Sequence, residues 1–87
     1  MQVFKSKAQD LIGFQYIDGV DLKAKLVELI GNDDFKLTSD GDMDIVFLEH
    51  KEYFIDIFPG DWVLKFPDGS FLSMEPEELY KNYAKVC

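Results

Sequence analysis

The amino-acid sequence predicts one small α+β domain over residues 1–87, with a mainly antiparallel sheet of about five or six short strands. Three observations lead to this fold class. An apolar stripe with helical spacing follows the first strand-like segment, short alternating segments separated by Asp-Gly or Pro-Gly pairs come next, and a proline-initiated helical pattern closes the chain. We therefore expect one helix after the first strand and a short C-terminal helix.

The first strand and the first helix are expected between residues 9 and 31. Residues 9–17 (QDLIGFQYI) have the composition of a strand, in which Gly13 marks a bulge or a close approach of two backbones. Asp21 is a suitable helix N-cap, and Gly31 can adopt the left-handed conformation that ends a helix. The apolar stripe between them consists of Leu22, Leu26, Leu29 and Ile30.

Short strands are expected to follow. Phe35–Leu37 and Met43–Leu48 form a predicted hairpin around the turn at 38–41 (TSDG), because an Asp-Gly pair suits a tight turn. Residues 51–58 form a further strand that ends at the Pro-Gly pair of 59–60. Its alternation predicts two faces, one with Tyr53, Ile55 and Ile57 and the other with Phe54, Asp56 and Phe58.

The last third of the chain predicts a hairpin and a helix. Residues 62–66 and 70–74 are expected to pair around the turn at 67–69 (PDG). Residues 75–86 are expected to be helical, with Pro76 in the first turn and acidic side chains that suit the helix dipole. The apolar stripe of this helix would be Leu79, Tyr83 and Val86.

Composition limits the classes of function. Hydrophobic residues make up 47% of the chain, which is too many for a disordered segment, and 17 acidic against 9 basic residues leave a net charge of -8. This acidity argues against direct binding of nucleic acid or of an anionic membrane. No apolar run is long enough to span a bilayer, and residues 1–19 lack the apolar run and the small-residue cleavage site that are typical of a secretory leader. Cys87 is the single cysteine. We expect a cytoplasmic protein without an intramolecular disulfide.

No catalytic, cofactor-binding or metal-binding residue is expected, and therefore no enzyme. His50, the single histidine, is expected to be exposed at a turn without a nucleophile to activate. Asp40, Asp42 and Asp44 have the spacing that opens a calcium loop, but Ile45 and Lys51 occupy the positions that require glycine and glutamate.

Two features are candidate partner or ligand surfaces. In the turn Gly60-Asp61-Trp62, Asp61 can accept hydrogen bonds from amides, while Trp62 either anchors the core or stacks on a ligand at a pocket edge. An acidic cluster is either a solvated face or an imitation of DNA phosphates; it consists of Asp33, Asp34, Asp40, Asp42 and Asp44. The aromatic residues of the second half either fill the core or leave an excess for a partner or homodimer contact: Phe54, Phe58, Trp62, Phe66, Phe71, Tyr80 and Tyr83.

Motifs along nearly the whole chain resemble a widespread family of small phage and prophage proteins without an assigned activity. A basic segment runs into a strand that ends in Gln15-Tyr16, and the segment 59–83 (PGDWVLKFPDGSFLSMEPEELYKNY) carries a Gly-Asp-aromatic turn, a Gly-aromatic step and a Pro-initiated helix ending in tyrosine. Two segments depart from the family pattern: Ser6-Lys7-Ala8 stands where Lys-Pro is usual, and Ser73-Met74-Glu75 where Pro-Cys-Lys is common. The resemblance implies a phage origin and brings no catalytic residue.

The hypothesis that follows is a non-enzymatic protein-binding module in the cytoplasm of a bacterial host. Its partner would be an unidentified host or phage protein, and the chain would act as a monomer or a homodimer. Two alternatives remain open. One is an acidic DNA mimic that inhibits a host nucleic-acid-binding or defence protein, and the other is a protein that binds or sequesters a small nucleotide-like ligand near Trp62.

Overall fold

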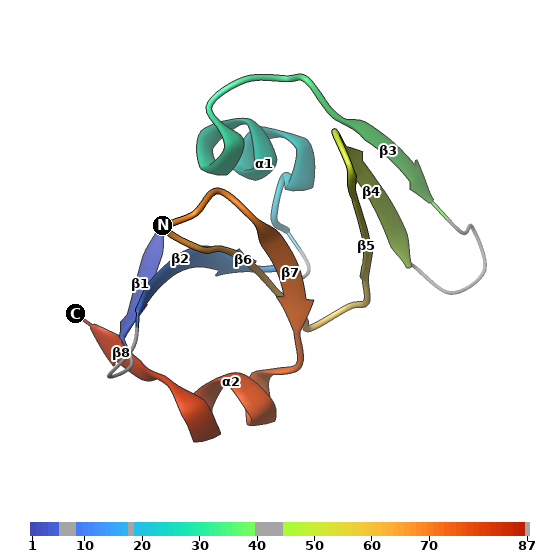
Figure 1. Ribbon diagram of the computed structural model, residues 1–87. Coiled ribbons are helices and arrows are strands. Elements are labelled where there is room, and N and C mark those ends of the chain that lie inside the picture. The colour runs from blue at the N-terminus through green and yellow to red at the C-terminus, as the bar shows by residue number, and fades with distance from the viewer. Residues whose placement is uncertain (6–8, 18, 40–44, 87) are drawn as a thin grey trace.

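Two antiparallel sheets and two helices make up the structure, a computed structural model that describes residues 1–5, 9–17, 19–39 and 45–86 (Figure 1). The larger sheet has five strands in the order β7-β6-β2-β1-β8, with bounds Phe71–Met74, Trp62–Lys65, Asp10–Gln15, Gln2–Lys5 and Ala84–Val86. The smaller sheet has three strands in the order β3-β4-β5, with bounds Lys36–Ser39, Val46–His50 and Tyr53–Ile57. The α+β class expected from the sequence is confirmed.

Helix α1 (Leu22–Ile30) begins and ends at the predicted residues. The Asp21 side chain accepts a hydrogen bond from the backbone N–H of Ala24 at 3.1 Å, which satisfies one free amide of the first turn. Gly31 takes the left-handed conformation with φ 95° and donates its N–H to the carbonyl oxygen of Val27 at 2.8 Å. The helix buries its apolar side against the rest of the domain, so caps and stripe act together.

The chain leaves the larger sheet after β2 and returns to it at β6. Two backbone hydrogen bonds join the end of β2 to the start of β6. Tyr16 donates its N–H to the carbonyl oxygen of Asp61 at 2.8 Å, and the carbonyl oxygen of Tyr16 accepts a hydrogen bond from the N–H of Gly60 at 2.7 Å. We call residues 17–59 the excursion; its described part contains α1 and the whole smaller sheet. The side chain of Gln15 reinforces the junction, since its amide donates to the Gly60 carbonyl oxygen at 3.0 Å.

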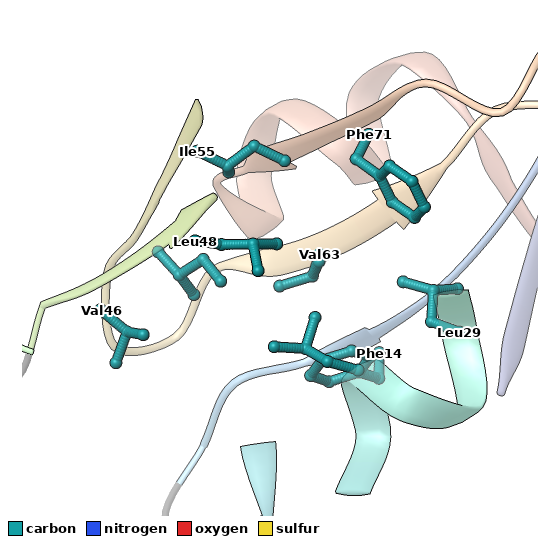
Figure 2. Close-up of a cluster of buried hydrophobic side chains, with 9 residues drawn as sticks. Phe14, Leu29, Val46, Leu48, Ile55, Val63 and Phe71 are labelled. Atoms are coloured by element: carbon teal, nitrogen blue, oxygen red, sulfur yellow. The ribbon is translucent and has the colours of Figure 1, made fainter. Parts of the chain in front are cut away.

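Each face of the larger sheet contributes to one buried hydrophobic cluster. On one face, α1 and the smaller sheet enclose the cluster shown in Figure 2, which consists of Phe14, Leu26, Leu29, Val46, Leu48, Ile55, Ile57, Val63 and Phe71. On the other face, helix α2 (Pro76–Asn82) covers a second cluster of Phe4, Leu11, Trp62, Leu64 and Leu79. Because neighbouring residues of a strand point to opposite faces, β6 contributes to both clusters in turn.

Both predicted hairpins form, and both are antiparallel. Strand β3 pairs with β4 in the register Leu37↔Leu48, and β6 pairs with β7 in the register Leu64↔Leu72. The Asp-Gly turn expected at residues 40–41 lies outside the described residues. In the second hairpin, Gly69 has φ 91° and donates to the Phe66 carbonyl oxygen at 3.0 Å, as a turn residue with positive φ should.

The C-terminal helix is shorter than the sequence suggests. It ends at Asn82, Tyr83 is extended with φ -136° and ψ 143°, and residues 84–86 form β8 instead of a further helical turn. Strand β8 pairs antiparallel with β1 in the register Lys5↔Ala84, so backbone pairing replaces the helical hydrogen bonds. The sequence pattern predicts no strand at residues 2–5 either, so the pairing of β1 with β8 is found only in the structure. Among the described residues, no helix is long and apolar enough to span a bilayer.

Candidate interaction surface

The Gly60-Asp61-Trp62 turn has a structural role. Gly60 has φ 90°, a conformation that favours glycine. The Asp61 carboxylate is only 8% exposed and accepts a hydrogen bond from the backbone N–H of Phe58 at 3.2 Å. The predicted role of Asp61, which is to bind an amide across the turn, is therefore confirmed.

Trp62 belongs to the core. It is 6% exposed. Its ring packs edge-to-face against the ring of Phe4, with 4.9 Å between the ring centroids and 85° between the ring planes. Its indole N–H donates to the hydroxyl oxygen of Tyr80 at 3.2 Å. A ring enclosed in this way offers no face on which a ligand could stack, so of the two interpretations of Trp62 the structure supports the core anchor.

His50 is buried, and the expectation of an exposed turn residue is wrong. It is the last residue of β4, where Val46, Leu48 and His50 alternate inward, and the turn follows at Lys51, whose φ is 53°. The ring is 6% exposed and its Nδ1 lies 2.6 Å from the carbonyl oxygen of Asp34. Since a carbonyl only accepts, Nδ1 is the donor, and the histidine fastens β4 to the segment that precedes β3.

The structure describes two of the five residues of the predicted acidic cluster. Asp33 and Asp34 are exposed in the bend between α1 and β3, where the Asp34 N–H donates to the side-chain oxygen of Asn32 at 2.8 Å. The other three members, Asp40, Asp42 and Asp44, lie outside the described residues, as does the rejected calcium-loop pattern that they form. The described pair is solvated and makes no ion pair with any described residue.

The outer face of the smaller sheet carries exposed phenylalanine rings. Phe47 on β4 is 40% exposed, Phe54 on β5 is 75% exposed, and Phe58 just after β5 is 46% exposed. Phe47 is paired with Asp56, and Phe54 with Glu49, so Phe47 and Phe54 occupy diagonal positions on one side of the sheet. We call Phe47, Phe54 and Phe58 the aromatic face. The alternation of residues 51–58 predicted two of its three members; the same period in residues 46–50 would have indicated Phe47.

Two grooves meet at Phe58. The first, of about 600 Å³, lies between β5, β7 and the start of α2 and includes Phe54, Asp56, Phe58, Leu72, Glu75 and Glu78 in its walls. The second, of about 540 Å³, lies on the side of the Pro59-Gly60 turn and adds Glu77 to the walls. Asp61 and Glu75 border both grooves, and the described residues that line the grooves include no lysine or histidine. The result is a mixed surface in which phenylalanine rings and carboxylates lie side by side.

Comparisons with models of protein families, with curated proteins and with solved structures find no match for this chain. Within the described part of the chain, no three His, Cys, Asp or Glu side chains lie close enough together to hold a metal ion.

Proposed function

We propose that this chain is a non-enzymatic protein-binding module that acts in the bacterial cytoplasm and contacts its partner through the aromatic face. The observation that carries the proposal is the exposure of three phenylalanine rings, of which Phe47 and Phe54 lie on one side of the smaller sheet and Phe58 lines a groove with Phe54. Single exposed apolar residues are ordinary, but a group of aromatic rings is typical of the centre of a protein interface.

The energetics favour a partner. Burying apolar surface releases about 25 cal/mol for each Å² removed from water, and aromatic rings offer more such surface than any other side chains. The domain already buries large residues in two clusters, so the rings of the aromatic face are additional to its own core. Their rigid rings also lose little conformational entropy on binding.

The family resemblance supports the same proposal from another direction. The Gly60-Asp61-Trp62 turn and the Pro-initiated helix resemble small phage and prophage proteins, and such proteins meet host and phage proteins in the infected cell. We infer that the partner belongs to one of these two groups.

A capture experiment with matched variants tests the proposal. Tagged wild-type protein, Phe54→Ser/Phe58→Ser and Ile17→Ser are incubated with a bacterial lysate, and the retained proteins are identified by mass spectrometry. Ile17 is 49% exposed outside the aromatic face, so its variant controls for the general loss of an exposed apolar side chain. We expect one partner to be retained by the wild type and by Ile17→Ser and to be lost by the double variant. Equal retention by all three, or no specific retention by the wild type, would refute the proposal.

The DNA-mimic alternative has separate support and a separate test. Asp33 and Asp34 are exposed at the bend before β3, which Figure 1 shows at the opposite end of the molecule from α2. Reversing both charges to lysine should abolish capture if the acidic cluster is the contact, and should leave it intact if the aromatic face is. The ligand-binding alternative is not supported at Trp62, because the enclosed ring cannot stack on a ligand.

A further inference from the structure

We propose that the segment that covers the aromatic face is basic: a stretch of a partner protein in which lysine or arginine residues alternate with apolar ones, lying across Phe58 through both grooves. The inference rests on the proposed function and adds the chemistry of the partner. It is carried by the walls of the two grooves, where phenylalanine side chains stand beside carboxylates.

The carboxylates come from three parts of the chain that are separate in sequence. Asp56 projects from β5, Asp61 from the turn before β6, and Glu75, Glu77 and Glu78 from the start of α2. The N-terminal end of a helix favours acidic residues by itself, which accounts for Glu77 and Glu78 in the first turn of α2. The helix dipole does not account for Asp56, which shares the groove from another sheet.

These carboxylates have no cationic partner within the described structure. The ion pair found among the described residues joins Lys25 to Glu28 at 4.0 Å, away from both grooves. Asp61 is satisfied by the Phe58 amide, whereas the side chains of Asp56, Glu75, Glu77 and Glu78 accept no hydrogen bond from the rest of the described chain. A neutral or acidic segment would bury these charges without compensation, so the grooves select against it.

A basic segment would satisfy the two components of the surface together. Its ammonium or guanidinium groups would meet the carboxylates, and either group also interacts favourably with the face of an aromatic ring such as Phe54 or Phe58. Its intervening apolar side chains would cover the rest of the rings. Grooves of about 600 and 540 Å³ are within the usual range of binding sites, so side chains of this length can enter them.

A labelled synthetic peptide that alternates arginine with leucine is the probe, and fluorescence anisotropy is the measurement. A peptide with glutamate in place of arginine is the reference. The groove variants are Glu75→Gln/Glu78→Gln and, away from the helix, Asp56→Asn. The matched control is Asp33→Asn/Asp34→Asn, which removes the same charge as the first variant from a distant exposed bend.

We expect the arginine peptide to bind the wild type and the glutamate peptide not to. Loss of two groove carboxylates should weaken binding about fivefold at low salt, while the control should change it less than about twofold. Binding should weaken as salt shortens the Debye length from about 30 Å at 0.01 M to about 8 Å at 0.15 M. Equal weakening by groove and control variants would show an effect of net charge alone and would overturn the inference, as would unchanged binding to both groove variants or absent binding to the wild type.

The two proposals fail in different ways. If the partner captured from lysate is lost by Phe54→Ser/Phe58→Ser but fully retained by both groove variants, the basic partner is refuted and the aromatic face stands. If the wild type captures nothing, the proposed function itself is refuted.

Discussion

Replacing Gly13 by alanine should destabilise the domain strongly, although alanine is ordinarily the better strand residue of the two. Gly13 lies in β2 between β1 and β6, opposite Gln2 on one side and Leu64 on the other. A Cβ built on this residue would overlap the carbonyl oxygen of Val63 and would lie 2.9 Å from the Leu64 Cδ2 atom and 3.1 Å from its Cα. The side chain of Leu64 can rotate, but the backbone of β6 cannot move without losing its pairing.

The expected magnitude follows from that geometry. Overpacking of a core typically costs about 1–3 kcal/mol, and because a backbone atom is the obstacle we expect about 3 kcal/mol for Gly13→Ala. A chain of 87 residues has a total stability of about 4–13 kcal/mol, so this is a large part of it. At about 4–8 °C for each kcal/mol in a domain of this size, Tm should fall by about 12–24 °C.

Thermal unfolding followed by circular dichroism is the assay. Without the steric overlap, alanine in the middle of a strand should be more stable than glycine by about 0.5–1 kcal/mol, so the two mechanisms predict opposite signs. Gly19→Ala gives the comparison: a Cβ there would meet no atom of the described residues within 4 Å, and the expected loss of about 1 kcal/mol comes from the φ of 86°. An unchanged or higher Tm for Gly13→Ala would refute the close approach of β2 and β6.

Two further predictions concern single hydrogen bonds. Tyr80→Phe removes the acceptor of the Trp62 indole N–H and should lower the free energy of unfolding by about 0.5–1.5 kcal/mol, measured by urea denaturation; no change would mean that water replaces the hydroxyl. The Ser70 hydroxyl donates to the Asp68 carboxylate at 2.6 Å and lowers the pKa of Asp68 from its ordinary value, with a further contribution from the Ser70 N–H. Because the folded-state pKa is the lower one, the stabilisation is present above the ordinary pKa and is lost as pH falls through the folded-state value. Ser70→Ala should raise the Asp68 pKa toward its ordinary value in an NMR titration, and an unshifted titration would contradict the assignment.

Local chemistry explains why much of the fold was predictable. The caps Asp21 and Gly31 and the turn at Gly69 act within a few residues of themselves, so their roles can be inferred from neighbouring residues. Strand β8 could not be recognised in this way, because its residues also satisfy a helical stripe and only the edge of β1, about eighty residues away in the sequence, decides between the two.

In the candidate site, too, some features follow from neighbouring residues and others depend on contacts between distant parts of the chain. The alternation of residues 51–58 predicts that Phe54, Asp56 and Phe58 share a face; within β5 this holds for Phe54 and Asp56, and Phe58, just after the strand, lines the same groove. The grooves on either side of Phe58 depend on how β7 and α2 approach β5, and no local pattern encodes that approach. The sequence around His50 suggests a turn because charged residues lie on both sides of it, whereas its position in the alternation of β4 directs its side chain inward.

The contacts that join the two ends of the excursion, at Gln15 and Tyr16 on one side and Gly60 and Asp61 on the other, affect the rate of folding. The side chain of Gln15 meets the Gly60 carbonyl across a separation of 45 residues, and the pairs between β2 and β6 run from Gln15↔Trp62 to Ile12↔Lys65, which are still further apart in the sequence. Chain entropy opposes the closure of so long a loop, and proteins dominated by such distant contacts fold in milliseconds to seconds rather than microseconds. Helix α1 and the β4–β5 hairpin have local contacts and can form early, so the rate-limiting event should be the meeting of β2 with β6. Mutations at this junction should therefore slow refolding, while mutations on the exposed rings should leave its rate unchanged.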